Sequence, residues 1–450
     1  MNSQFLLAAA HSGAGKTTVT LGLLRALQRK GLRVQPFKCG PDYIDPIHHR
    51  TAAGKDSINL DRFMMSDTHI HQLYNQYGSA ADVGITEGVM GLFDGAKKSE
   101  GSSADIAKLL GLPVILVLNA KAMAYSAAAL LYGLKNFDRE LNVAGVIFNF
   151  VDRESHYRLL CEACGDVGIK ALGHLPVNDS LRIPSRHLGL DTTNAETTIA
   201  AAADHIEKHI DLAALLAATS TTKADQTPLV TQTPLVTQTP LITKTPRKKV
   251  DAATGSNKKI LVAYDEAFHF LYPENIRRLE EYGQVSYFSP IKDTQLPFIP
   301  DLLYLPGGYP ELHLPELSGN ESLVQQISAY AASNRPIIAE CGGMMYLGRE
   351  IQDLTGKSWP MTSVLDISTS LVHKKMTLGY RTVRLGDLVL KGHEFHFSQP
   401  LGEYAPSAAE VCNAHDVRVD TPVFYHPHLL ASYAHFYWGE DKSLVQRLLS

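Results

Sequence analysis

Residues 11–18 read HSGAGKTT, and they stand between the short apolar run 5–10 and the amphipathic segment 19–30. Strand, glycine loop and helix in this order form the context that a phosphate-binding loop requires. Gly13 and Gly15 allow backbone N–H groups to curl around an anion, which the N-terminus of the following helix also favours. The stretch therefore predicts an α/β nucleotide-binding domain.

The loop also predicts what its polar side chains do. Lys16 is expected to meet the β- and γ-phosphates of ATP, while Thr17 offers its hydroxyl to Mg²⁺ and Thr18 completes the phosphate site. Ala10 stands where the full motif has its first glycine, so the loop is a deviant one. An ordinary glycine loop that caps a helix is the alternative, and the strand-to-helix junction favours nucleotide binding over it.

A six-residue repeat divides the chain. TPLVTQ, TPLVTQ, TPLITK and TP follow one another between Gln226 and Pro246. Proline at every sixth position interrupts helices and central strands, so the repeat predicts an extended linker. We expect a phosphate-loop domain over residues 1–216, a linker over 217–257 and a second domain over 258–450.

Both domains are predicted to be α/β, with mostly parallel sheets. Each alternates short β-rich runs with helix-length segments, which is the pattern of a parallel sheet covered by helices. The candidate buried strands are 5–10, 83–86, 114–118 and 143–149 in the first domain, and 260–264, 302–305 and 337–339 in the second.

Composition excludes several kinds of partner. Lys and Arg number 42 against 46 Asp and Glu, which gives no electrostatic reason to expect nucleic acid or an anionic membrane. No apolar run approaches the roughly 20 residues of a membrane-spanning helix, and no signal peptide is recognisable. The five scattered cysteines fit a reducing compartment. We therefore expect a cytoplasmic protein that acts on small molecules.

Two polar segments follow predicted strands of the first domain, where open α/β sheets bind their ligands. Residues 38–48 read KCGPDYIDPIH, and residues 87–95 read EGVMGLFDG. Their carboxylates are candidate oxygen ligands of Mg²⁺, and Lys38 would neutralise charge on a transferred phosphoryl group. Turn-forming Asp and Gly residues are the alternative for each segment. The candidate carboxylates are Asp42, Asp45, Glu87 and Asp94.

The second domain contains a candidate nucleophile. Residues 336–347 read PIIAECGGMMYL, which places Cys341 on a sharp turn from strand to helix. A cysteine in this position is expected to be exposed to substrate, and the helix N-terminus favours its thiolate. A small buried core cysteine is the alternative.

Two further segments support this chemistry. Residues 305–311 read LPGGYPE, and the N–H groups of Gly307 and Gly308 are the predicted oxyanion hole. Residues 431–438 read ASYAHFYW, in which His435 is the candidate base for Cys341. Together they make thioester chemistry coherent.

Several of these segments carry a family resemblance. KCGPDYIDPIHH, SINLD at 57–61, EGVMGLFDG and PSRHLGL at 184–190 closely resemble the cobyrinate a,c-diamide synthases. The first domain of that family is similar in fold to dethiobiotin synthetase, which also has a deviant phosphate loop. The order PGGYPE, AECGG, SYAH resembles the class I glutamine amidotransferases, in the branch joined to cobyrinate and cobyrate synthases.

The resemblance implies an ATP-dependent amidation. A corrinoid carboxylate attacks the γ-phosphate of ATP, and ammonia then displaces phosphate from the acyl phosphate, so that the c and a acetate side chains of cobyrinate become amides. Cys341 releases the ammonia from glutamine, and His435 moves the protons. The N-terminal residues that this resemblance places near the corrinoid, Mg²⁺ and the reacting carboxylate are Asp42, Tyr43, Ile44, Asp45, Glu87 and Asp94, with Asp45 and Asp94 as catalytic groups and Thr17, Asp42 and Glu87 as metal ligands.

Some alternatives stay open. Many class I enzymes have Glu two residues after the histidine, but Tyr437 stands there, so the third triad member is unassigned. GHEFHFS at 392–398 offers His393, Glu394 and His396. Cys161 and Cys164 form a CxxC without a second pair, which favours a structural role.

Two rival functions also remain. The first is the same chemistry on hydrogenobyrinate or nickel sirohydrochlorin, whose side-chain acetates would meet the same ATP site. The second, from another class, is a phosphate-loop ATPase switch with a degenerate amidotransferase module.

Overall fold

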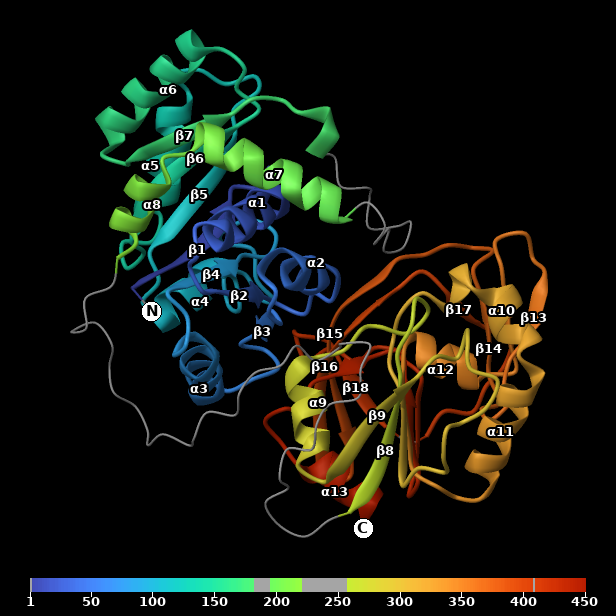
Figure 1. Cartoon of the computed structure of the whole chain (residues 1–450). Coiled ribbons are helices and arrows are strands. Elements are labelled where there is room, and N and C mark those ends of the chain that lie inside the picture. Colours follow the sequence, from blue (N-terminus) through green and yellow to red (C-terminus); the bar gives the residue numbers. More distant parts are fainter. Residues whose placement is uncertain (1, 182–194, 221–256, 408) are drawn as a thin grey trace. The chain divides into compact units, whose positions relative to one another are not determined.

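The computed structural model describes residues 2–181, 195–220, 257–407 and 409–450 (Figure 1). The chain divides into two compact units, residues 1–244 and 245–450. The hexapeptide repeat and the PSRHLGL segment lie outside the described residues. Each unit is described by itself.

The first unit is built on a seven-stranded sheet with the order β3-β2-β4-β1-β5-β6-β7. All of its neighbouring strands run parallel. The strands are β1 (Ser3–Ala9), β2 (Val34–Cys39), β3 (Ile58–Leu60), β4 (Val83–Glu87), β5 (Val114–Asn119), β6 (Val143–Asn149) and β7 (Ala171–Leu175).

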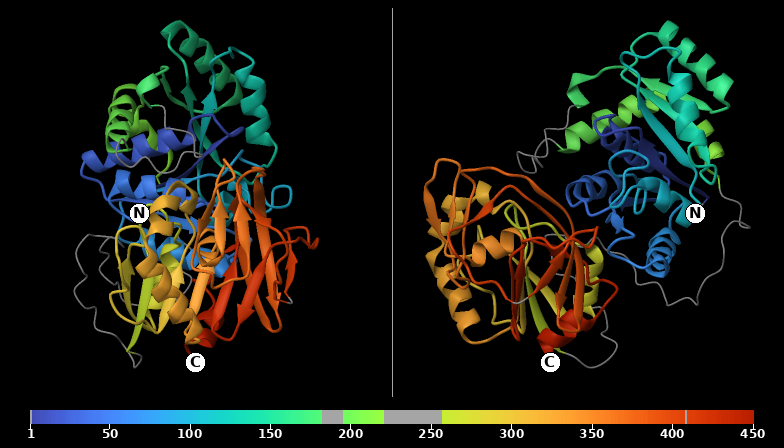
Figure 2. Two further views of the ribbon diagram at one scale, coloured as in Figure 1. Left: turned by 90° about the vertical axis from the view of Figure 1, so that its right-hand side faces the viewer. Right: turned by 180° about the vertical axis from the view of Figure 1, so that it is seen from behind.

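Helices cover both faces of this sheet, as Figures 1 and 2 show. The helices are α1 (Lys16–Arg29), α2 (Ile44–Ala53), α3 (Asp67–Gly78), α4 (Ser103–Leu110), α5 (Ala127–Asn136), α6 (Glu154–Val167), α7 (Ala195–His209) and α8 (Leu212–Ala218). On one face α1 packs against α2 and α7.

Apolar burial explains why β1 lies at the centre. Phe5, Leu6 and Leu7 are fully buried, as expected for a parallel strand with helices above and below it. Leu23 of α1 and Ile206 of α7 belong to the same core as Leu7. The sheet therefore fixes the carboxyl ends of strands β1, β2 and β4, at which the glycine loop and the two polar segments lie.

The second unit has a main sheet of six strands in the order β19-β20-β11-β10-β8-β9. All pairs in this sheet are parallel except β19 with β20. Its strands are β8 (Lys258–Ala263), β9 (Gly283–Phe288), β10 (Leu302–Leu305), β11 (Ile337–Glu340), β19 (Val423–His426) and β20 (Leu429–Ser432). The predicted α/β class is confirmed in both units.

Two smaller sheets extend the second unit, and the strand prediction did not include them. One is the antiparallel sheet β18-β15-β16-β21, and the other has the order β13-β12-β14-β17. Their strands are β12 (Glu350–Gln352), β13 (Ser358–Pro360), β14 (Ser368–Ser370), β15 (Thr377–Leu385), β16 (Leu388–His396), β17 (Gln399–Leu401), β18 (Glu410–Cys412) and β21 (His435–Phe436).

The helices of the second unit are mostly short. They are α9 (Pro273–Glu280), α10 (Leu314–Gly319), α11 (Glu321–Ala332), α12 (Gly342–Leu347) and α13 (Ser443–Leu449), with a 3₁₀ turn at Pro310–Leu312. In the described part of the chain, no helix has the length and apolar character needed to cross a membrane.

Candidate active sites

The glycine loop leads from β1 into α1. Gly13 and Gly15 have φ angles of 81° and 94°, in the left-handed region that favours glycine. A Cβ atom on Gly15 would lie 2.1 Å from Nδ2 of Asn149. The same Nδ2 donates a hydrogen bond of 3.0 Å to the carbonyl of Ala14. Position 15 therefore admits only glycine, and the end of β6 supports the loop.

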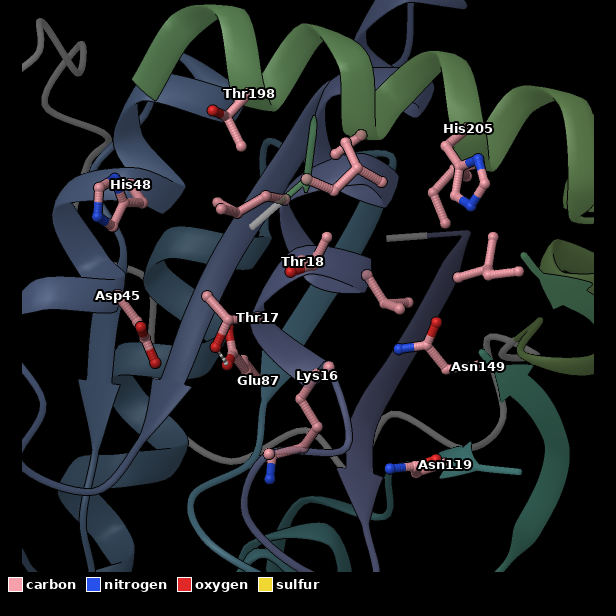
Figure 3. A pocket seen from close by; sticks show the side chains of 18 of the residues that line it. Lys16, Thr17, Thr18, Asp45, His48, Glu87, Asn119, Asn149, Thr198 and His205 are labelled. Carbon is pink, nitrogen blue, oxygen red and sulfur yellow. Dashed lines mark hydrogen bonds between the residues drawn. The ribbon is translucent and has the colours of Figure 1, made fainter. Parts of the chain in front are cut away.

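A cavity of about 900 Å³ lies over this loop (Figure 3). Its volume is in the range of small-molecule sites. The predicted site residues that line it are Gly13, Gly15, Lys16, Thr17, Thr18, Lys38, Asp42, Ile44, Asp45 and Glu87. The structure thus brings together the glycine loop and parts of both polar segments.

Two predicted residues of this site do not line the cavity. The side chain of Tyr43 is 9% exposed and belongs to the core. Asp94 is exposed, and its Oδ2 accepts a hydrogen bond of 2.9 Å from the N–H of Gly91, which makes it a turn-forming residue here. Their roles toward substrate stay predictions.

Lys38 lies buried among three carboxylates. Its Nζ is 2.6 Å from Oδ2 of Asp45, 3.3 Å from Oε1 of Glu87 and 3.7 Å from Oδ2 of Asp42. Lys38 and Glu87 are register partners on the adjacent parallel strands β2 and β4, so their side chains point to the same face. One ammonium thus faces three carboxylate side chains, and an arrangement of this kind favours a cation.

Glu87 is the centre of this group. Its Oε1 accepts a hydrogen bond of 2.7 Å from the hydroxyl of Thr17, and its Oε2 lies 2.6 Å from Nε2 of His49. Burial alone would raise the pKa of Glu87, but the charge of Lys38 and the hydrogen bond with His49 outweigh it and hold the pKa below its usual value. The carboxylate is therefore ionised at neutral pH.

His49 was not predicted as a site residue. Its ring is fully buried, and Nδ1 lies 3.0 Å from the hydroxyl of Ser57. The signal that could have identified it is its spacing of four residues from Asp45, which puts both side chains on one face of α2.

Asp42 has a structural contact as well as a place in the cavity. Its Oδ1 accepts hydrogen bonds from the N–H groups of Ile44 and Asp45, at 2.9 and 3.0 Å. The side chain therefore satisfies the first turn of α2, where backbone donors lack helical partners. This contact orients Ile44 and Asp45 toward the cavity.

Lys16 extends from the start of α1 to the other polar segment. Its Nζ donates a hydrogen bond to the carbonyl of Met90. Met90 itself has a φ of 46°, an uncommon conformation for a residue other than glycine.

The cavity is also lined by groups that the sequence analysis did not assign. Figure 3 shows Asn119, Asn149, Thr198 and His205 among them. Thr198 and His205 come from α7, and Nε2 of His205 lies 3.1 Å from the carbonyl of Pro176. Helix α7 begins far from the glycine loop in the sequence, so spacing alone gave no indication that it would reach the loop.

In the second unit, Cys341 occupies the turn between β11 and α12. Its backbone has φ 44° and ψ −105°, and its N–H donates a hydrogen bond of 2.7 Å to the carbonyl of Ser432. Such a strained turn at a non-glycine residue is typical of functional sites. The register of β11 with β20 pairs Glu340 with Ser432, which explains this contact.

The thiol differs from the expectation that it would be exposed and favoured as thiolate. Cys341 is 3% exposed, and its Sγ lies 3.9 Å from the carbonyl oxygen of Phe395. Burial raises the pKa of the thiol well above its ordinary value, Glu311 and Glu394 raise it further, and the N–H of Gly342 opposes them. The thiol is therefore neutral in this state, and attack on a substrate requires a proton acceptor.

The three predicted segments of the glutaminase meet at Cys341. A Cβ on Gly307 would lie 2.1 Å from Cε1 of His435, so the imidazole rests directly on Gly307. A Cβ on Gly342 would lie 3.2 Å from the backbone nitrogen of Gly308. LPGGYPE, AECGG and ASYAH thus converge on one place.

His435 is a buried, neutral base. Burial lowers its pKa to about 3, with further lowering by His393 and His396. A neutral imidazole has a ring nitrogen that can accept the proton of a thiol.

Glu394 of the GHEFHFS segment is engaged with other groups. Its Oε1 lies 2.7 Å from Nε2 of His396, and its Oε2 accepts hydrogen bonds from Arg381 and, at 2.8 Å, from Thr421. Tyr437, two residues after His435, packs edge-on against an aromatic ring. Neither observation assigns a third triad member.

The remaining cysteine motif lies on α6. Cys161 and Cys164 are free thiols there. Across the described ranges, no cluster of three or more His, Cys, Asp or Glu side chains is arranged to hold a metal ion by itself.

Two family descriptions match the chain. Residues 5–190 match the CobQ/CobB/MinD/ParA nucleotide binding domain, and residues 259–443 match the CobB/CobQ-like glutamine amidotransferase domain. The fold and the two sites thus define a class of protein in which a glutamine amidotransferase is joined to an ATP-binding domain. The chain is an ATP-dependent carbon–nitrogen ligase with glutamine as nitrogen donor.

Proteins of similar sequence identify the family within this class. A cobyrinate a,c-diamide synthase of Caldanaerobacter subterraneus subsp. tengcongensis is 39% identical over 99% of this chain and 97% of the relative. A hydrogenobyrinate a,c-diamide synthase of Brucella abortus is 40% identical over 89% of this chain and 90% of the relative. The chain belongs to the a,c-diamide synthase family that these proteins represent.

Solved structures are more distant. A crystal structure described as a glutamine amidotransferase is 15% identical, with a TM-score of 0.29, and covers 42% of this chain and 96% of that one.

Proposed function

We propose that this enzyme amidates the a and c acetate carboxylates of cobyrinate in two rounds, each using one ATP and one glutamine. The observation that carries the proposal is that the glycine loop shares one cavity with the buried Lys38, Asp45 and Glu87 group, in a chain that a named cobyrinate a,c-diamide synthase matches over 99% of its length.

The first step activates a carboxylate. An oxygen of the corrinoid acetate attacks the γ-phosphorus of ATP, ADP leaves, and an acyl phosphate forms. Lys16 and Lys38 neutralise charge that develops on the phosphoryl oxygens. ATP is required because hydroxide is a poor leaving group, whereas phosphate leaves readily.

Ammonia then completes the amide. It attacks the acyl carbon, phosphate leaves, and a cavity carboxylate takes up the surplus proton. Asp45 is our candidate for this acceptor because its carboxylate lines the cavity and is held by Lys38. The parts of Tyr43 and Asp94 stay predictions.

Mg²⁺ fits the first site as a proposed cofactor. Its preferred partners are phosphate oxygens, water and one or two carboxylates. The Thr17 hydroxyl and Glu87 Oε1, 2.7 Å apart beside the phosphate loop, are donors of this kind, and Asp42 lines the same cavity. When bound, the ion would offset the charge of the phosphates.

The second site would supply the ammonia. The Sγ of Cys341 attacks the amide carbon of glutamine, His435 takes the thiol proton and delivers it to the departing nitrogen, and the Gly307 and Gly308 N–H groups stabilise the oxyanion. Water then hydrolyses the thioester to glutamate. In the empty site the raised pKa of Cys341 and the lowered pKa of His435 both oppose this transfer, so the proton moves only as Sγ attacks bound glutamine.

The same proposal includes the domain limits of 1–216 for the amidating domain, 217–257 for the linker and 258–450 for the glutaminase. The family matches at 5–190 and 259–443 lie within the two proposed domains. Helix α8 (Leu212–Ala218) ends two residues inside the proposed linker, and the carbonyl of Thr219 accepts a hydrogen bond of 3.1 Å from the N–H of Gln4, so the first domain extends a few residues beyond 216.

Hydrogenobyrinate, the metal-free substrate, is the second candidate. The relatives named for it are as similar to this chain, at 40%, as those named for cobyrinate, at 39%. Family membership disfavours the ATPase switch.

The test is mass spectrometry of the products. The purified chain is incubated with cobyrinate or hydrogenobyrinate, ATP, Mg²⁺ and glutamine labelled with ¹⁵N in its amide. We expect a product with two labelled amides from cobyrinate. Label in only one amide, or in neither corrinoid, would contradict the proposal.

A further inference from the structure

Glu340 is the last residue of β11 and directly precedes Cys341. Its side chain is 1% exposed. Its Oε2 accepts a hydrogen bond of 2.8 Å from the hydroxyl of Tyr304, and its Oε1 accepts one of 2.9 Å from the backbone N–H of Phe436. Phe436 is the neighbour of His435, so one buried side chain joins the strand that ends at the nucleophile to the strand that carries the base.

A second buried side chain holds the same strand from another element. Asn275 of α9 is fully buried. Its Nδ2 donates a hydrogen bond of 2.8 Å to the carbonyl of Phe436, and its oxygen accepts one of 2.9 Å from the N–H of Trp438. Both backbone polar groups of Phe436 are therefore bound by buried side chains: its N–H by Glu340 and its carbonyl by Asn275.

Close packing against two glycines limits the movement of His435. Gly392 of β16 is the register partner of Phe436, and a Cβ on it would lie 2.2 Å from the carbonyl oxygen of His435. On the other side the imidazole rests on Gly307. Since His435 is confined on both of these sides, its position depends on where the backbone of β21 is fixed.

We propose that Glu340 is a positioning residue of the glutaminase, which holds the imidazole of His435 in register with the thiol of Cys341 through the backbone of Phe436. The proposal rests on the roles proposed above for Cys341 and His435. It assigns an orienting function to Glu340, the residue before the nucleophile. Many class I enzymes have a glutamate two residues after the histidine, and this chain has Tyr437 there.

Hydrogen bonding, rather than charge, is the expected basis of this role. Burial raises the pKa of Glu340 to about 8, which the N–H of Phe436 and the hydroxyl of Tyr304 oppose. The group is thus largely neutral at pH 7. A glutamine side chain keeps the contact with Phe436 through its oxygen, and its amide nitrogen donates to the phenol oxygen of Tyr304, which reverses the direction of the present bond.

The experiment compares Glu340→Ala with Glu340→Gln. Glutamine hydrolysis gives kcat and KM, and amidation driven by a high ammonia concentration reports on the first unit. For Glu340→Ala we expect kcat for glutamine hydrolysis to fall about 100-fold, the loss associated with a displacement of about 1 Å in an active site, with KM nearly unchanged. Glu340→Gln should recover most of this loss.

Glu274→Gln is the matched control. Glu274 is also a buried glutamate of the second unit, 2% exposed, but it bonds to Arg277 on its own helix. Its carboxylate bonds to the side chain of Arg277, whereas that of Glu340 bonds to the backbone of Phe436, so Glu274→Gln should leave kcat within about threefold of the parent.

Several outcomes would overturn the inference. They are a full kcat in Glu340→Ala, a rise of KM in place of the fall in kcat, or a large loss in a folded Glu340→Gln variant. A large loss of kcat in a folded Glu340→Gln variant would overturn the inference even if Glu340→Ala does not fold. Cys341→Ala separates the two proposals: if it still hydrolyses glutamine, the proposed function fails, whereas if it is inactive while Glu340→Ala is fully active, only the inference fails.

Discussion

The hydroxyl of Thr17 donates a hydrogen bond of 2.7 Å to Oε1 of Glu87, which joins the first turn of α1 to the end of β4. This contact links the glycine loop to the buried carboxylates beside Lys38. Nucleotide binding and carboxylate chemistry therefore share one connected group of side chains.

The buried ring of His49 should contribute measurably to stability. His49→Phe leaves Oε2 of Glu87 without its partner at 2.6 Å, and an unsatisfied buried acceptor costs about 1–3 kcal/mol. We expect the free energy of unfolding, measured with urea, to fall by that amount. His49→Gln retains a donor and should lose less, and equal losses in both variants would contradict the role of this bond.

Lys16→Ala should prevent amidation whichever nitrogen source is used. The ammonium that would neutralise the phosphates is lost, and the expected decrease in kcat is at least about 100-fold. Product formation with glutamine and with ammonia is measured by mass spectrometry. Glutamine hydrolysis at Cys341 should persist, and amidation at the parental rate would refute the phosphate-loop assignment.

Cys341→Ala should have the opposite pattern. Without the nucleophile no thioester can form, so glutamine-dependent amidation should disappear, while amidation with a high concentration of ammonia continues within about threefold of the parent. The matched control is Cys412→Ala, which removes a buried free cysteine of the same unit. Glutaminase activity that survives in Cys341→Ala would exclude this residue as the nucleophile.

The stability of the second unit should depend on the ionisation of His269. Burial lowers the pKa of His269 from 6.5 to about 4. Between those values the unfolded chain binds the proton more strongly than the folded one, so this group's contribution to stability is present above pH 6.5 and is lost as pH falls toward 4. The difference in unfolding free energy between the parent and His269→Phe should change by about 1.4 kcal/mol for each pH unit in this window.

Urea titrations of both proteins at several pH values between 4 and 7 give this difference. A difference that stays constant across the window would show that His269 has an ordinary pKa in the folded chain.

Much of the fold could be predicted, because buried parallel strands are apolar runs bounded by polar turns. The expected strand 143–149 is β6 (Val143–Asn149), and the expected strand 337–339 is β11 with one residue more. The glycine loop lies at a strand-to-helix junction for the same reason. The small sheets with β15 and β16 were not predicted, since these two strands are not continuous apolar runs: β16 alternates buried with more exposed residues, and β15 mixes the two.

The site was harder to predict than the fold. Lys38 and Glu87 were singled out separately, but only the register of β2 with β4 shows that they face each other. His49 is one of 19 histidines and has no local signal beyond its helical spacing from Asp45. The expected exposure of Cys341 was wrong because β16 covers its turn, and nothing local to the turn indicates that distant strand.

The covered turn of Cys341 has a consequence for chemical durability. Peroxide attacks thiolates that it can reach, and the first product is a sulfenic acid. A thiol that is 3% exposed and has a raised pKa offers little of the reactive anion. The resting enzyme should therefore tolerate oxidants that inactivate proteins with open, ionised cysteines.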